Sequence, residues 1–249
     1  MNSSIETMPH TTTLQDREES GPKGLQPVDH PESLKQIAYK ALHRALLTGD
    51  LKPGQVYKEK DLAKMLNISR TPVREALLEL STKGLVTFLP RKGIQVTQFD
   101  LQDLNEIFEL RKALELMAIE KVSDTISSEQ LQDLEAALER QRSCAQVNDL
   151  MGFLQHDREF HTLLSELTDN RRLVANLETI RDLIQFMGAH ALSAHGRLQE
   201  VIAEHLTVIS ALAAKDPEEA RKNMAHHLEM SRQKAESILF SPSGEKSQG

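Results

Sequence analysis

The chain has 249 residues, of which 39% are hydrophobic and 27% charged, with a formal net charge of -7. These values are typical of a globular protein of one or two domains. A single cysteine excludes an internal disulfide framework, and no apolar run approaches the ~20 residues of a membrane span. The N-terminus lacks the basic and apolar regions of a signal peptide. The sequence therefore predicts a cytoplasmic protein with no membrane partner.

The first hundred residues divide into a polar tail and a compact domain. Residues 1–31 are rich in Ser, Thr, Glu and Pro, which predicts a disordered tail. Helical periodicity and turn residues then predict three helices, at 34–46, 59–66 and 71–83, with Thr71 as the N-cap of the third. Two β-prone segments follow, at 85–88 and 94–97, joined by a turn. Three helices and a hairpin indicate a winged helix-turn-helix, which we assign to residues 32–98.

This predicted domain is basic although the chain is acidic. Ser33 to Gln98 contains twelve Lys and Arg but five Asp and Glu, a net charge of +7 that leaves -14 for the rest of the chain. Such an asymmetry is expected of a nucleic-acid-binding module.

The residues expected to contact DNA lie at three places in the predicted domain. Arg70 and Arg74 open the third helix, where side chains reach base edges in the major groove, and Ser69 and Thr71 add donors suited to phosphate. At the hairpin tip, Arg91 and Lys92 could enter the minor groove or rest on the backbone, and Gly93 permits close approach. Lys60, which opens the preceding helix, is a further candidate for a phosphate contact.

From residue 99 to 240 the sequence is almost entirely helical. A 3.6-residue period recurs in six segments, at 103–123, 128–146, 149–167, 172–189, 199–214 and 217–239. Six helices of this length predict an antiparallel bundle, so the fold class is mainly α, and residues 241–249 form a second disordered tail.

Four polar residues lie on the apolar stripes of this bundle: Asp157, His161, His205 and His227. Asp157 and His161 are four residues apart and share a helix face. Buried polar groups need partners, and one carboxylate with three imidazoles suits a divalent ion such as Zn²⁺, Ni²⁺ or Mn²⁺. The alternative is a set of core histidines paired with Asp157.

Arg111 is a fifth polar residue on an apolar stripe. A buried guanidinium needs an anion. Either Glu115 in the next turn (or another acid of the chain) supplies it, or Arg111 anchors a bound organic acid.

The stretch "LLTGDLKPGQVYKEKDLAKMLNISRTPVREALLELSTKGLV" resembles the DNA-binding domain of the GntR family, and its S-R-T-P-V-R-E-A-L core is specific to it. The later helices resemble the FCD ligand-sensing domain of the FadR-like branch. Their number, six rather than seven, resembles the VanR-like subgroup of that branch. The resemblance implies DNA contacts at Lys60, Arg70, Thr71, Arg74 and Gly93. It also implies a metal site at Asp157, His161, His205 and His227, and an acid-binding Arg111. Lys58 departs from the family, which usually has a Ser-like cap there.

These observations favour a homodimeric transcription factor, predicted to be a repressor that binds a palindromic DNA operator and responds to a small carboxylate effector. Two alternatives remain at this point. A metal-dependent hydrolase would need a general base, and no H-E-x-x-H or similar motif is present. A metal-ion sensor would respond to the ion itself.

Overall fold

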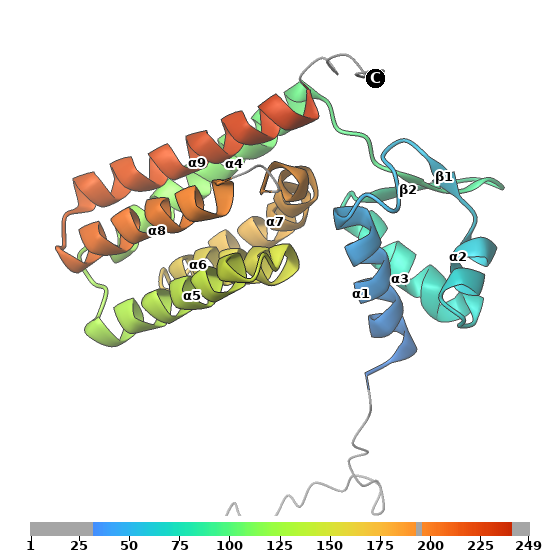
Figure 1. Cartoon of the computed structure of the whole chain (residues 1–249), viewed down its shortest axis with the longest axis horizontal. Coiled ribbons are helices and arrows are strands. Elements are labelled where there is room, and N and C mark those ends of the chain that lie inside the picture. Colours follow the sequence, from blue (N-terminus) through green and yellow to red (C-terminus); the bar gives the residue numbers. More distant parts are fainter. Residues whose placement is uncertain (1–31, 193–195, 241–249) are drawn as a thin grey trace, which may run out of the picture. The chain divides into compact units, whose positions relative to one another are not determined.

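The computed structural model describes residues 32–192 and 196–240, and over these ranges it contains nine α-helices and one three-stranded sheet (Figure 1). This mainly helical architecture, with strands confined to the N-terminal part, is the predicted fold class. The predicted tails, 1–31 and 241–249, lie outside the described residues. Within the described ranges, none of the helices has the length and apolar character that crossing a membrane requires.

The N-terminal part is a winged helix-turn-helix. Its helices are α1 (Leu34–Leu47), α2 (Glu59–Met65) and α3 (Arg70–Thr82), and its strands are β1 (Val56–Tyr57), β2 (Val86–Leu89) and β3 (Gly93–Val96). The strands are antiparallel in the order β1-β3-β2. The predicted hairpin is β2-β3. Strand β1 was not predicted, because two residues after a Pro-Gly turn are too short to show an alternating pattern.

The predicted start of the third helix is wrong by two residues. Ser69, not Thr71, is the N-cap of α3, and Arg70 is already helical. Pro72 therefore falls third in the helix, still within the first turn, where a backbone N–H has no intrahelical acceptor. Lys58 occupies the N-cap of α2 without a side-chain capping hydrogen bond, as its departure from the family pattern suggested.

The second part contains the six predicted helices. They are α4 (Leu101–Val122), α5 (Ser128–Gln146), α6 (Leu150–Glu166), α7 (Arg171–Leu192), α8 (Arg197–Ala213) and α9 (Pro217–Leu239). Capping boxes begin α4 at Asp100 and α5 at Ser127. Helices α5 and α6 pack side by side, as do α8 and α9 (Figure 1). Their apolar stripes form a core around Phe153, Phe160 and Leu212.

A charged cluster connects α3, α6 and α7. Lys83, the C-cap of α3, places Nζ 2.8 Å from Oδ2 of Asp182 on α7. The other oxygen of Asp182 accepts a hydrogen bond of 2.6 Å from Nη1 of Arg158 on α6, whose Nη2 pairs with Glu178. We call Lys83, Asp182 and Arg158 the charged junction. Asp182 is only 2% exposed, so its two cations are needed to stabilise it as a carboxylate.

Candidate functional site

The first candidate site is the cationic surface formed by α2, α3 and the hairpin. Six of the eight residues predicted to contact DNA line one open hollow there: Lys60, Arg70, Arg74, Arg91, Lys92 and Gly93. Ser69 and Thr71 lie outside its lining but are exposed at the start of α3. Among the described residues, Lys60, Arg70, Arg91 and Lys92 have no ion-pair partner, so their charges are available to an external anion.

Arg74 is held in place before any DNA binds. Its Nη1 lies 2.6 Å from Oε1 of Glu59, and its guanidinium lies 5.5 Å from the ring centroid of Phe88. A carboxylate and an aromatic face restrict the orientation of the planar guanidinium.

Gly93 is required by the sheet itself. Its φ is +126°, and a Cβ at this position would lie 2.1 Å from the carbonyl oxygen of Tyr57. Only glycine allows β1 to pass this close to β3. The need for glycine therefore has a structural cause, whatever Gly93 contributes toward DNA.

The second candidate site is buried in the helical bundle. His161 on α6, His205 on α8 and His227 on α9 each offer one ring nitrogen, and the three nitrogens lie within 4.8 Å of one another. All three rings are nearly inaccessible to solvent. Three histidines from three helices thus converge, as the apolar stripes predicted. We call them the histidine cluster.

Each ring of the cluster is anchored through Nδ1. His161 Nδ1 lies 2.6 Å from Oε2 of Glu115, His205 Nδ1 lies 2.9 Å from Oε1 of Gln141, and His227 Nδ1 lies 2.7 Å from Oε2 of Glu204. The Gln141 amide also donates through Nε2 to Asp157, 3.1 Å away, which leaves its Oε1 as an acceptor. The network therefore places an N–H group at Nδ1 of each ring.

The Nε2 atoms consequently present lone pairs to the centre of the cluster. His205 Nε2 and His227 Nε2 are 3.4 Å apart, and neither carries a proton in this assignment. Burial lowers the pKa of both His205 and His227 well below the usual value, and the neighbouring imidazoles and Arg111 lower it further. Nε2 lone pairs on imidazoles that are anchored through Nδ1 are the donor set that a divalent metal ion requires.

Asp157 lies beside the cluster but outside the group of three nitrogens. Its Oδ1 is 3.8 Å from His205 Nε2, and its side chain is partly exposed. The carboxylate is near enough to serve as a fourth ligand after a small movement.

Arg111 has the internal partner that one of its two interpretations predicted, and its role as an anchor for an acid stays a prediction. Its Nε donates to Oε1 of Glu115 at 2.8 Å, which is the internal partner, and it also lines a pocket. Its Nη2 lies 3.0 Å from His161 Nε2. Burial would raise the pKa of Glu115, but His161 and Arg111 hold that pKa well below its usual value. Because Nε2 of His161 has one lone pair, it cannot accept from Arg111 and bind a metal at once.

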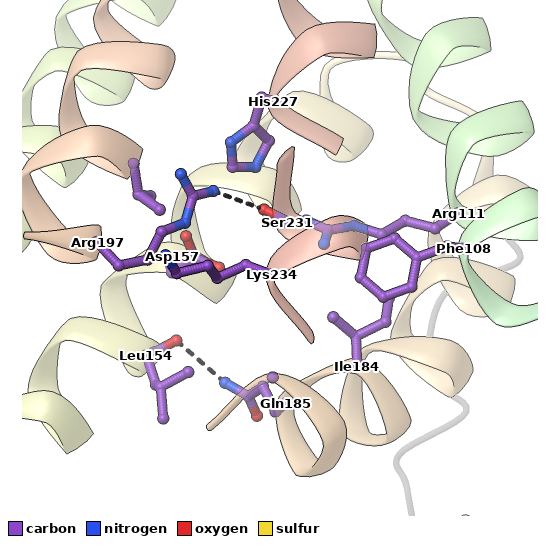
Figure 2. Close-up of a pocket in the computed structure, with 12 residues that line it drawn as sticks. Phe108, Arg111, Leu154, Asp157, Ile184, Gln185, Arg197, His227, Ser231 and Lys234 are labelled. Atoms are coloured by element: carbon purple, nitrogen blue, oxygen red, sulfur yellow. Dashed lines mark hydrogen bonds between the residues drawn. The ribbon is translucent and has the colours of Figure 1, made fainter. Parts of the chain in front are cut away.

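The pocket adjoins the histidine cluster and is lined by residues of α4, α6, α7, α8 and α9 (Figure 2). Arg111, Asp157 and His227 line it, and apolar atoms of Phe108, Leu154, Ile184 and Val201 form much of its wall. Arg197, Ser231 and Lys234 add polar groups. The cavity is small, about 50 Å³, whereas one water needs roughly 10–15 Å³. It therefore suits a small molecule.

Sequence reasoning missed Gln141 and Glu204, which orient the cluster, and two of the three Lys and Arg residues that line the pocket. Gln141 follows Leu134, Ala137 and Leu138 on the buried face of α5, so a polar residue on an apolar stripe was again the available signal. Glu204 precedes His205 directly. Arg197 and Lys234 gave no sequence signal, because their role depends on which helices meet.

Comparisons with known proteins agree with this architecture. Residues 34–96 match the family described as "Bacterial regulatory proteins, gntR family", and residues 106–230 match the family described as "FCD domain". The first match covers the winged helix-turn-helix, and the second covers the helices that carry the histidine cluster.

The chain is also similar to individual bacterial regulators. It is 30% identical over 201 residues to the HTH-type transcriptional regulator YdhC of Bacillus subtilis, covering 80% of this chain and 90% of that protein. It is 27% identical to the HTH-type transcriptional repressor RspR of Escherichia coli, covering 80% and 87%. The solved structure of Escherichia coli McbR/YncC superposes with a TM-score of 0.67 at 28% identity, covering 84% of this chain and 98% of that one.

Proposed function

Since the chain belongs to the GntR family of bacterial regulatory proteins and carries an FCD domain, it is a DNA-binding transcriptional regulator, and we propose that it is a repressor controlled by a small organic acid. The acid would bind in the pocket beside a divalent metal ion held by the histidine cluster. Its relatives are transcriptional regulators rather than enzymes, so the hydrolase alternative does not apply. The name of the similar RspR protein supports repression.

The observation that supports the metal is the convergence of three unprotonated Nε2 atoms. His161, His205 and His227 would be the ligands, with Asp157 as a fourth. The bound ion would supply a positive charge and an open coordination position for a carboxylate. Because metal and Arg111 compete for His161 Nε2, a bound metal would leave the Nη2 group of Arg111 available to the acid.

The observation that supports DNA binding at α3 is the set of unpaired cations around it. Two copies of the winged domain would read the two halves of a palindromic operator, so the functional unit would be a homodimer. Acid binding would shift the population toward a state with low operator affinity.

The experiment that tests this function is selection of bound DNA from a random pool by the metal-loaded protein, with and without a panel of small organic acids. A short palindrome enriched only when one acid is absent is the expected result. Enrichment that depends on the metal and on no acid would instead support a metal-ion sensor. Enrichment of an operator without inverted symmetry would contradict the homodimer.

A further inference from the structure

We propose that the effector carries two anionic groups, and that Lys234 binds the second of them. This inference rests on the proposed function, because it specifies the class of acid that the pocket would accept.

Among the described residues, one of the three Lys and Arg side chains that line the pocket has no partner. Arg111 pairs with Glu115, and Arg197 places Nη1 2.5 Å from Oε1 of Glu204 and 3.2 Å from Oε2 of Glu200. Lys234 is half-buried, lines the pocket, and forms neither an ion pair nor a hydrogen bond through its ammonium group within the described ranges.

The contrast is sharpest within α9 itself. This helix carries four Lys and Arg residues. Arg221 pairs with Glu120, Lys222 with Glu219, and Arg232 with Glu229 and Glu236. Lys234 has no acid three or four residues away on either side, where a helical partner would stand. Of the four, Lys234 faces the pocket, and it is the one that has no acidic partner within the described ranges.

The position of Lys234 fits an anion at the far end of a short ligand. His227, Ser231 and Lys234 are spaced four and three residues apart, so they share one face of α9. Lys234 lies about 10 Å beyond His227 along the axis, and side chains on a helix lean toward its N-terminus. Lys234 therefore leans back toward the metal end, and Figure 2 shows it extending from α9 into the pocket.

The remaining lining defines the rest of the ligand. The apolar part of the lining is formed by Phe108, Leu154, Ile184 and Val201, which suit methylene groups. One carboxylate would lie at the metal and Arg111, and the other at the ammonium of Lys234. A short aliphatic dicarboxylate has this pattern, and the small cavity excludes long-chain or aromatic diacids.

The test is isothermal titration of the full-length, Zn²⁺-loaded protein with acids matched in length, succinate against butyrate and glutarate against pentanoate. We expect the better diacid to bind at least about tenfold more tightly than its monoacid, the effect of one charge-assisted contact. Lys234→Gln should reduce the affinity for the diacid to that for the monoacid. Lys234→Arg should retain most of the preference for the diacid.

The control is Lys222→Gln, which removes an exposed cation from the same helix and should change neither affinity. Equal binding of diacids and monoacids, with no effect of Lys234→Gln, would overturn the inference and leave the proposed acid sensor intact. If the protein binds Zn²⁺ but none of the four acids, the inference fails together with the proposed acid control. Retained Zn²⁺ stoichiometry and Tm show that each variant is folded.

Discussion

At the scale of single residues, the anchoring of the histidine rings matters as much as the rings themselves. Glu204 accepts from Nδ1 of His227 and also pairs with Arg197. We expect Glu204→Gln to lower metal affinity about ten- to a hundredfold, since partners of metal ligands have effects of this size. Competition with a chromogenic chelator measures it. Glu200→Gln is the matched control, because Glu200 pairs with the same arginine but contacts no histidine of the cluster. An equal loss in both variants would assign the effect to Arg197.

Arg111 should influence the metal and the acid in opposite directions. Its Nη2 competes with a metal for His161 Nε2, and its charge repels a cation. Arg111→Gln is therefore expected to bind the metal at least as tightly as the wild type, but the acid about tenfold or more weakly. Titrations of metal and then acid separate the two effects. Lys112→Gln, an exposed neighbour, should alter neither. A variant that loses both ligands would show that Arg111 only supports the fold.

At the scale of elements, α3 and the hairpin should divide the reading of DNA between them. Arg74→Lys keeps the charge but loses bidentate geometry, so it should reduce discrimination between operator and random DNA by about 1–3 kcal/mol. Lys92→Ala should weaken binding to all DNA sequences alike. It should also reduce the slope of log affinity against log salt concentration by about the value of one phosphate contact. Fluorescence anisotropy across a salt series measures both. If Lys92→Ala reduced sequence discrimination and Arg74→Lys did not, base recognition would lie in the hairpin.

Helix α7 contributes to stability through the charged junction. Burial would raise the pKa of Asp182, but the hydrogen bonds and charges of Lys83 and Arg158 outweigh it and hold that pKa below its usual value. A carboxyl with a depressed pKa stabilises the fold above its unfolded pKa, about 3.9, and this contribution is lost as pH falls through the lower folded value.

Asp182→Asn should therefore lower the free energy of unfolding by about 1–3 kcal/mol at pH 7. The difference from the wild type should shrink as the pH drops below about 3.9. Tm measured at several pH values tests this, with the exposed Asp133→Asn as the control. A deficit that persists unchanged in acid would show that lost packing, not charge, is responsible.

Helices and strands could be predicted from the sequence where the interactions that form them are local in the chain. The bundle helices have local signals, namely a 3.6-residue period and capping residues, and the predicted bounds of α5 and α9 match the observed ones. Strand β1 exists only because β3 lies beside it, about forty residues later in the chain. The cap of α3 was misplaced because both Ser69 and Thr71 are good N-cap residues.

Residues of the candidate site could be predicted only where a polar side chain lies on an otherwise apolar helix face. Three histidines and Arg111 are polar positions on apolar stripes, which periodicity can detect. The partners Glu115 and Glu204 could not be assigned to particular rings, since each contact joins side chains on two different helices and depends on how those helices pack. Lys234 looks like any surface lysine until the neighbouring helices are in place.

At the scale of the whole molecule, the charged junction links the DNA-binding part to the helices that carry the candidate ligands. We expect Asp182→Asn to bind metal and acid with unchanged affinity, while the acid has a reduced effect on operator binding, because the link between the two equilibria is weakened. Paired titrations of acid alone and of operator with saturating acid measure this. A full response in the variant would show that signalling takes another route.

Asp157 and Arg158 are consecutive residues of α6, one beside the histidine cluster and the next within the charged junction. A helix transmits rotation rigidly over such a short distance, so a shift of α6 that moves the carboxylate must also move the guanidinium. Changes that retune α6 for a different ligand will therefore alter how strongly the ligand acts on DNA. Ligand choice and regulatory strength are thus tied to one another, and evolution or design would have to adjust them together.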